Sequence, residues 1–127
     1  MTPEQWAGEV VGLPYCDRAD GPDEFDCFGL AMDYVRRVLG RQCSLSGYAE
    51  GRPFADLLPT ATGWEQNDGG FVLCAFNSDG HPTHIGVIVG DYVVHAYGRE
   101  SGGQVFRHNR RAFERLFTDL RIYTYVG

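Results

Sequence analysis

Two histidines, His84 and His95, stand in the otherwise apolar stretch HPTHIGVIVGDYVVHAYG, residues 81–98. Valine or isoleucine would pack better in such a β-rich run, so the two imidazoles need a reason. In one interpretation they are polar residues on the water-facing side of a strand. In the other they share a face of the sheet because a reactive group lies beside them.

The turn between the two apolar runs decides whether the histidines can meet. Only Gly90–Asp91 separate HIGVIV from YVVHAY, and Gly followed by another residue suits a two-residue type II′ hairpin turn. This turn fixes the register, so that Gly86 faces His95 and His84 faces Tyr97. The two histidines then become diagonal neighbours on one face, with backbones roughly 7–8 Å apart. A one-residue change of register would put them on opposite faces.

A cysteine begins the clearest helix of the chain. In CFGLAMDYVRRVLG, which starts at Cys27, apolar residues recur at helical spacing, and Gly40 supplies a natural end. The apolar stripe consists of Leu30, Ala31, Tyr34, Val35, Val38 and Leu39. A thiol at a helix start lies near unpaired backbone N–H groups, which stabilise the thiolate.

Together these residues make a nucleophile, a base and an orienting group. Cys27 would attack, His84 would take its proton, and His95 would fix the tautomer of His84. The backbone N–H of Cys27 could stabilise a developing oxyanion. The alternative is structural, because a lone cysteine on a helix is often a small buried hydrophobe and a lone histidine in a strand often packs or faces water.

The remaining elements favour an α+β fold with an antiparallel sheet. Thr2 and Gln5, with Pro3 between them, predict a capped helix that runs to about Gly12 and buries Trp6. Helices come first and strands later in the chain, which argues against a doubly wound parallel sheet. We expect a loop at 14–26, mostly loop at 41–66 with a short helical turn at 53–58, strands at 70–77, 84–90, 92–98, 105–108 and 120–126, and a short helix at 110–117.

Composition bounds the function. The chain has 127 residues, which predicts one domain spanning 1–127, and its net charge of −6 with no basic cluster argues against a nucleic-acid partner. No apolar run approaches a membrane span and the N-terminus lacks the features of a secretory signal, so we expect synthesis in the cytoplasm. We expect free thiols at Cys16, Cys27, Cys43 and Cys74. A zinc site from Cys74, His81 and His84 fits no common spacing, so we expect neither metal nor cofactor.

Several segments together resemble a known family. PDEFDCFGLAMDYVRRVLG is similar to the Asp-Cys-x-Gly-Leu motif of NlpC/P60 cysteine peptidases, in particular their phage tail branch. HIGVIVGDYVVHAYG resembles the family's His-x-Gly-Ile strand, turn and second strand ending in His-Ala. The segment containing Tyr15, GLPYCDRADGPDEFDC, resembles its Pro-Tyr segment, and RIYTYV its closing strand. Residues 41–66 have no counterpart.

The resemblance implies a papain-like α+β fold and hydrolysis of an amide in bacterial peptidoglycan stem peptides, of the γ-D-glutamyl-diamino acid endopeptidase type. It implies Cys27 as nucleophile, His84 as base and His95 as the orienting third residue. Tyr15 would line the site near the oxyanion with its hydroxyl available as a donor, and Asp26 would be a helix-start group. Phage tail-tip proteins would be partners, and the virion tail the place from which the enzyme reaches the cell wall.

The sequence departs from the family pattern around the expected cleft. CDRAD follows the Pro-Tyr pair, and the acid before the histidine strand is displaced in NDGGFVLC. These differences bear on the choice of substrate more than on the Cys–His–His set. Two alternatives therefore stay open: a non-catalytic tail-assembly protein that keeps the fold, and a related thiol amidase or acyltransferase with another substrate.

Overall fold

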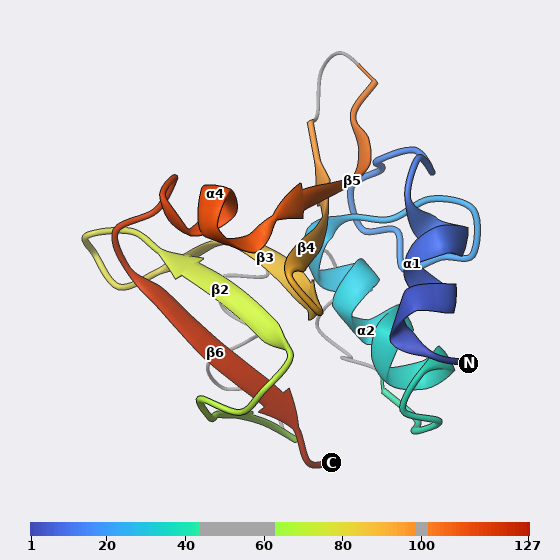
Figure 1. Ribbon diagram of the computed structural model, residues 1–127, viewed down its shortest axis with the longest axis horizontal. Coiled ribbons are helices and arrows are strands. Elements are labelled where there is room, and N and C mark those ends of the chain that lie inside the picture. Colours follow the sequence, from blue (N-terminus) through green and yellow to red (C-terminus); the bar gives the residue numbers. More distant parts are fainter. Residues whose placement is uncertain (44–62, 99–101) are drawn as a thin grey trace.

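A six-stranded antiparallel sheet forms the centre of the protein, and its strand order is β1-β6-β2-β3-β4-β5. The computed structural model describes residues 1–43, 63–98 and 102–127. Two helices lie together on one side of the sheet, away from the short helix α4 (Figure 1). The elements are α1 (Pro3–Val10), α2 (Cys27–Arg37), β1 (Trp64–Gln66), β2 (Val72–Phe76), β3 (Pro82–Val89), β4 (Tyr92–Tyr97), β5 (Gln104–Asn109), α4 (Arg110–Glu114) and β6 (Leu120–Tyr125).

The hairpin of β3 and β4 has the register that the sequence predicts. Val89 pairs with Tyr92, and the ladder continues to the pair of Val87 and Val94. Gly90 has a φ of +59°, whereas Arg18 is the only non-glycine with a positive φ among the described residues. A positive φ at the first turn position alone is the pattern of a type II′ turn, so this prediction is confirmed.

The sheet separates two apolar clusters, because successive side chains of a strand point to opposite faces. On one face α2 packs against β3 and β4, and the large core there includes Ile85, Val87 and Val94. On the other face α4 covers a smaller cluster, in which Phe113 meets Val93 and its neighbours. His84 and His95 alternate with the large-core residues along their strands, so they lie on the α4 face.

Local signals place the helices close to where the sequence predicts them. Thr2 and Gln5 form the expected capping box, with hydrogen bonds of 2.9 and 3.1 Å, and α1 ends at Val10, two residues before Gly12. The helix α2 begins at Cys27 and ends at Arg37, shortly before Gly40, whose φ is +67°. No helix among the described residues is long and apolar enough to cross a membrane.

Three details differ from the prediction or escape it. The strand β1 lies in a region predicted as loop; it has only three residues and is held by pairing with β6 and by burial of Trp64. The predicted helix at 110–117 ends at Glu114. The helical turn predicted at 53–58 lies outside the described residues.

Candidate active site

The four residues singled out from the sequence line one pocket. Tyr15, Cys27, His84 and His95 all border a cavity of about 820 Å³ between the start of α2, the β3–β4 hairpin and the segment around α4. The rest of its lining consists of Thr83, Ala96, Tyr97, Gly98, His108, Phe113, Leu116 and Phe117. Cys27, at the start of α2, and the two histidines, on the α4 face of the sheet, therefore border the same cavity.

The start of α2 holds Cys27 firmly in place. The carboxylate of Asp26 caps the helix, accepting hydrogen bonds from Gly29 N at 2.6 Å and from Arg18 N at 3.0 Å. Asp26 is thus the helix-start group that the sequence predicts. A Cβ on Gly29 would lie 2.0 Å from the carbonyl oxygen of Ala19, so only glycine allows the 14–26 loop to pack on this first turn.

The thiol of Cys27 is not the activated thiolate expected of a helix start. Burial, followed by the negative charge of Asp26, raises the pKa of Cys27 to about 12. Backbone N–H groups of Ile85, Phe28 and Cys27 itself oppose this rise by favouring the thiolate, but they do not outweigh burial. The side chain is only 7% exposed, which the sequence spacing did not reveal. The thiol is therefore neutral in the free protein.

Three histidines form a hydrogen-bonded chain across strands β3, β4 and β5. His84 Nε2 lies 2.9 Å from His95 Nδ1, and His95 Nε2 lies 2.8 Å from His108 Nδ1. His84 and His95 are 9% and 5% exposed, whereas His108 is exposed. Burial, then the neighbouring His84 and His108, lowers the pKa of His95 to about 3. The middle ring is therefore neutral across the physiological range.

Packing fixes the orientation of the middle ring. The His95 ring meets Phe113 edge-on at a centroid distance of 4.9 Å. Gly86 lies next to the same side chains: a Cβ there would lie 2.4 Å from Val93 Cγ1, and 3.5 Å from both His95 Cβ and Phe113 Cζ. The close approach of Val93 therefore requires glycine at this position.

Tyr15 lines the pocket, but its hydroxyl is already used. It donates to Asp17 Oδ1 at 2.8 Å, and burial together with this bond raises the pKa of the phenol. In the structure this donor is therefore directed to Asp17, and the role of Tyr15 near the oxyanion stays a prediction. The backbone N–H of Cys27 stays the predicted oxyanion donor.

The sequence did not indicate His108 as a site residue. Its strand was predicted, but a long connection separates it from β4, so no short turn fixed the register. In the structure Val93 pairs with His108 and His95 with Phe106. His108 is therefore the diagonal neighbour of His95, displaced by two residues in the same direction as His95 is from His84. A histidine at this diagonal position of the next predicted strand was the sequence feature that could have indicated it.

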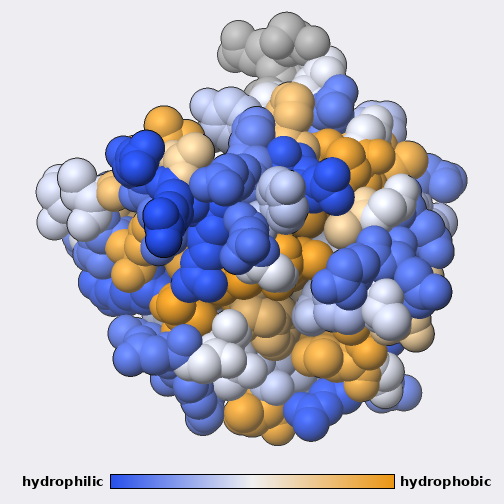
Figure 2. All heavy atoms as spheres, in the orientation of Figure 1, coloured by the Kyte–Doolittle hydropathy of each residue, from blue (hydrophilic) through white to orange (hydrophobic). Residues whose placement is uncertain are grey.

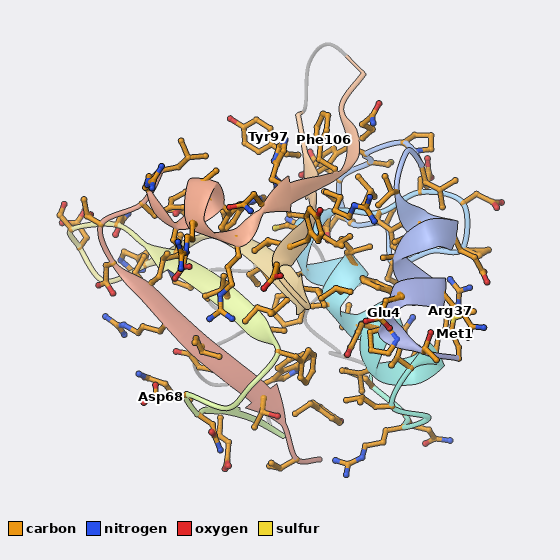
Figure 3. All side chains as sticks on the ribbon, in the orientation of Figure 1. Met1, Glu4, Arg37, Asp68, Tyr97 and Phe106 are labelled. Atoms are coloured by element: carbon orange, nitrogen blue, oxygen red, sulfur yellow. The ribbon has the colours of Figure 1, made fainter. Side chains whose placement is uncertain are left out.

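The outer wall of the pocket is apolar. Leu116 and Tyr97 are 72% and 62% exposed, and Tyr97 lies at the end of β4 with Phe106 near the start of β5 (Figure 3). On the face shown in Figure 2, hydrophobic residues reach the surface in several separate areas between hydrophilic ones. The described lining includes no Asp, Glu, Lys or Arg. Within the described part of the chain, no group of three or more His, Cys, Asp or Glu side chains is arranged to hold a metal ion.

The helix that begins with a cysteine, the antiparallel sheet and the histidine-bearing hairpin define an α+β fold of the papain-like NlpC/p60 type. Among solved structures, the chain resembles the NlpC/p60 domain of the peptidoglycan hydrolase SagA, with a TM-score of 0.58 and 20% identity over 94% of this chain and 93% of that one. No family model and no curated protein sequence matches the chain. The predicted fold class is thereby confirmed.

Proposed function

We propose that the protein is an NlpC/P60-type cysteine hydrolase that cleaves an amide bond in bacterial peptidoglycan stem peptides. The observation that carries the proposal is the shared pocket of Cys27, His84 and His95, with the two histidines hydrogen-bonded at 2.9 Å. A fold like that of a peptidoglycan hydrolase domain supports the choice of substrate class.

In the proposed reaction His84 acts as the general base. Its Nε2 is engaged by His95, so Nδ1 is the nitrogen that takes the proton of Cys27 as the sulfur attacks the amide carbonyl. The protonated His84 then gives this proton to the leaving amine, which leaves an acyl thioester on Cys27. Water, deprotonated by His84, attacks the thioester and releases the acid and the free thiol.

The neutral resting state fits this order of events. Since burial holds Cys27 as a thiol, proton transfer accompanies attack and does not precede it. His95 orients His84 and stabilises the imidazolium that forms during attack.

The finer assignments rest on the sequence resemblance. We propose a γ-D-glutamyl-diamino acid endopeptidase carried by a phage or prophage tail, with tail-tip proteins as partners. Mass spectrometry of muropeptide products tests the bond, because cleavage after the D-glutamyl residue gives a fragment with a free diamino acid amine. Proteomics of purified phage particles tests the location.

The central experiment is digestion of purified peptidoglycan and defined muropeptides by the wild-type protein. Cys27→Ser and His84→Gln should each lose nearly all activity, since removing the nucleophile or base removes about 10²-fold or more of the rate. His81→Asn changes an exposed histidine outside the pocket and is the matched control. Wild-type protein without muropeptide cleavage would contradict the proposal and favour the non-catalytic assembly role.

One observation favours a second candidate, a thiol amidase or acyltransferase acting on a more apolar substrate. Tyr97, Leu116 and Phe117 present apolar surface to the pocket, which a hydrophobic acyl group would cover. Cleavage of p-nitrophenyl esters of long-chain acids, lost in Cys27→Ser and faster than muropeptide cleavage, would favour this candidate.

A further inference from the structure

We propose that His108 is a positioning residue that sets the tautomer of His84 through His95, and that protonation of His108 switches the pocket to a form in which His84 cannot act as a base. The effect on catalysis rests on the proposed function. The effect on the tautomers does not, and can be measured without any substrate.

The hydrogen-bonded chain of His84, His95 and His108 has two different ends. The inner end is His84, which borders the same pocket as the buried thiol of Cys27. The outer end is His108, which is exposed and whose ring stacks on Phe106 at a centroid distance of 5.5 Å and an interplanar angle of 9°. This stacking holds the His108 ring in the plane from which Nδ1 reaches His95 Nε2 at 2.8 Å.

Each neutral imidazole has one N–H donor and one acceptor nitrogen, so the chain must run in one direction. For His84 Nδ1 to accept the proton of Cys27, His84 must carry its hydrogen on Nε2 and donate it to His95 Nδ1. His95 then carries its hydrogen on Nε2 and donates it to His108 Nδ1. The competent state therefore requires His108 Nδ1 to be an acceptor.

Protonation of His108 reverses this direction. In the imidazolium both nitrogens are donors, so His108 Nδ1–H must donate to His95 Nε2. His95 then donates from Nδ1 to His84 Nε2, and the hydrogen of His84 moves to Nδ1, the position that would take the thiol proton. A single proton at an exposed ring thus removes the base from the buried site, with no movement of the backbone.

The titratable and charged groups near His108 come from β4, from its own strand and from α4. From β4 the titratable group facing it is His95, and the other titratable groups of the pocket are Cys27, Tyr15 and Tyr97 besides His84. Among the charged side chains on its own strand and on the adjoining helix, Arg107, Arg110 and Glu114 have partners elsewhere, and Arg111 is exposed. Arg107 lies over the Tyr92 ring at 4.8 Å, and Arg110 pairs with Glu114 at 3.5 Å.

The direct test is side-chain ¹H–¹⁵N NMR of the wild-type protein, titrated from neutral to mildly acidic pH. Long-range couplings distinguish Nδ1–H from Nε2–H tautomers. We expect His84 and His95 to carry Nε2–H at neutral pH and to change to Nδ1–H together, at the pH at which His108 becomes protonated. Fixed tautomers of His84 and His95 through the protonation of His108 would overturn the proposal.

The variant His108→Asn keeps a hydrogen-bond acceptor at this position but cannot gain the positive charge of an imidazolium. The asparagine oxygen can replace Nδ1 as acceptor but cannot be protonated in this range, so His84 and His95 should keep Nε2–H at acidic pH. Over the same pH decrease, the rate of Cys27 alkylation by iodoacetamide should then fall in His108→Asn by a factor about ten times smaller than in the wild type, because the base is retained. His81→Asn should behave as wild type.

The removal of the acceptor gives the complementary result. His108→Phe leaves His95 Nε2–H without its partner, so a mixture of tautomers and slower alkylation are expected already at neutral pH. If His108→Asn and wild type show the same pH dependence of Cys27 alkylation, the inference fails. A tautomer change without muropeptide cleavage would instead refute the proposed function and leave this inference standing.

Discussion

The depressed pKa of His95 makes a quantitative prediction about stability. Lowering the pH from about 7.5 to about 4.5 should reduce the free energy of unfolding by about 2 kcal/mol through this residue alone. The reason is that burial and the neighbouring His84 and His108 hold the pKa of His95 at about 3, against an ordinary value of 6.5.

The sign follows from proton binding. Between pH 6.5 and pH 3 the unfolded chain binds a proton at His95 and the folded protein does not, so stability falls as the pH decreases through this window. At about pH 4.5, two units below the unfolded pKa, the difference amounts to about 2 to 3 kcal/mol at 1.36 kcal/mol per unit. Solvent at the exposed end of the histidine chain screens part of the charge, which leaves about 2 kcal/mol.

Urea unfolding followed by tryptophan fluorescence, at both pH values, measures this difference. The variant His95→Gln cannot titrate, so its free energy of unfolding should fall by about 2 kcal/mol less than that of the wild type over the same interval. His81→Gln, at an exposed histidine, is the control and should follow the wild type. Equal losses in wild type and His95→Gln would refute the reasoning.

Three further substitutions probe the start of α2 and its surroundings. Asp26→Asn keeps a good N-cap but removes the charge that raises the pKa of Cys27, so the pH profile of Cys27 alkylation should move to lower pH; an unchanged profile would contradict this. Gly29→Ala should lower the free energy of unfolding by about 2 kcal/mol or more in urea, because its Cβ meets the Ala19 carbonyl at 2.0 Å. Gly8→Ala, on α1, adds a Cβ with nothing within 4 Å and should instead raise the free energy of unfolding by about 0.5–1 kcal/mol, because alanine is more favourable than glycine inside a helix. A lower free energy of unfolding in this variant would contradict that reasoning.

The sequence predicts those parts of the fold that local chemistry determines. The turn at Gly90–Asp91 fixes the hairpin register and thereby the shared face of His84 and His95, because a two-residue turn leaves one register. The capping box at the first helix and the cysteine helix followed in the same way from local spacing.

The properties that depend on tertiary contacts could not be predicted in this way. His108 joins the chain only because β5 pairs with β4 in a register set by distant contacts. The elevated pKa of Cys27 results from burial, whereas the sequence indicates only the helix start, which acts in the opposite direction. The use of the Tyr15 hydroxyl by Asp17 likewise depends on how the 14–26 loop folds.

Burial explains why the direction of the histidine chain matters. It raises the pKa of Cys27 to about 12 and lowers that of His95 to about 3, so both groups are neutral when the protein is at rest. A chain of neutral imidazoles can run in either direction, and the groups at its two ends decide which. In the proposed mechanism Cys27 is the donor at the inner end, and the competent direction also requires His108 to accept at the outer end. The pH response that we propose for catalysis therefore comes from an exposed ring and not from the buried groups that would carry the chemistry.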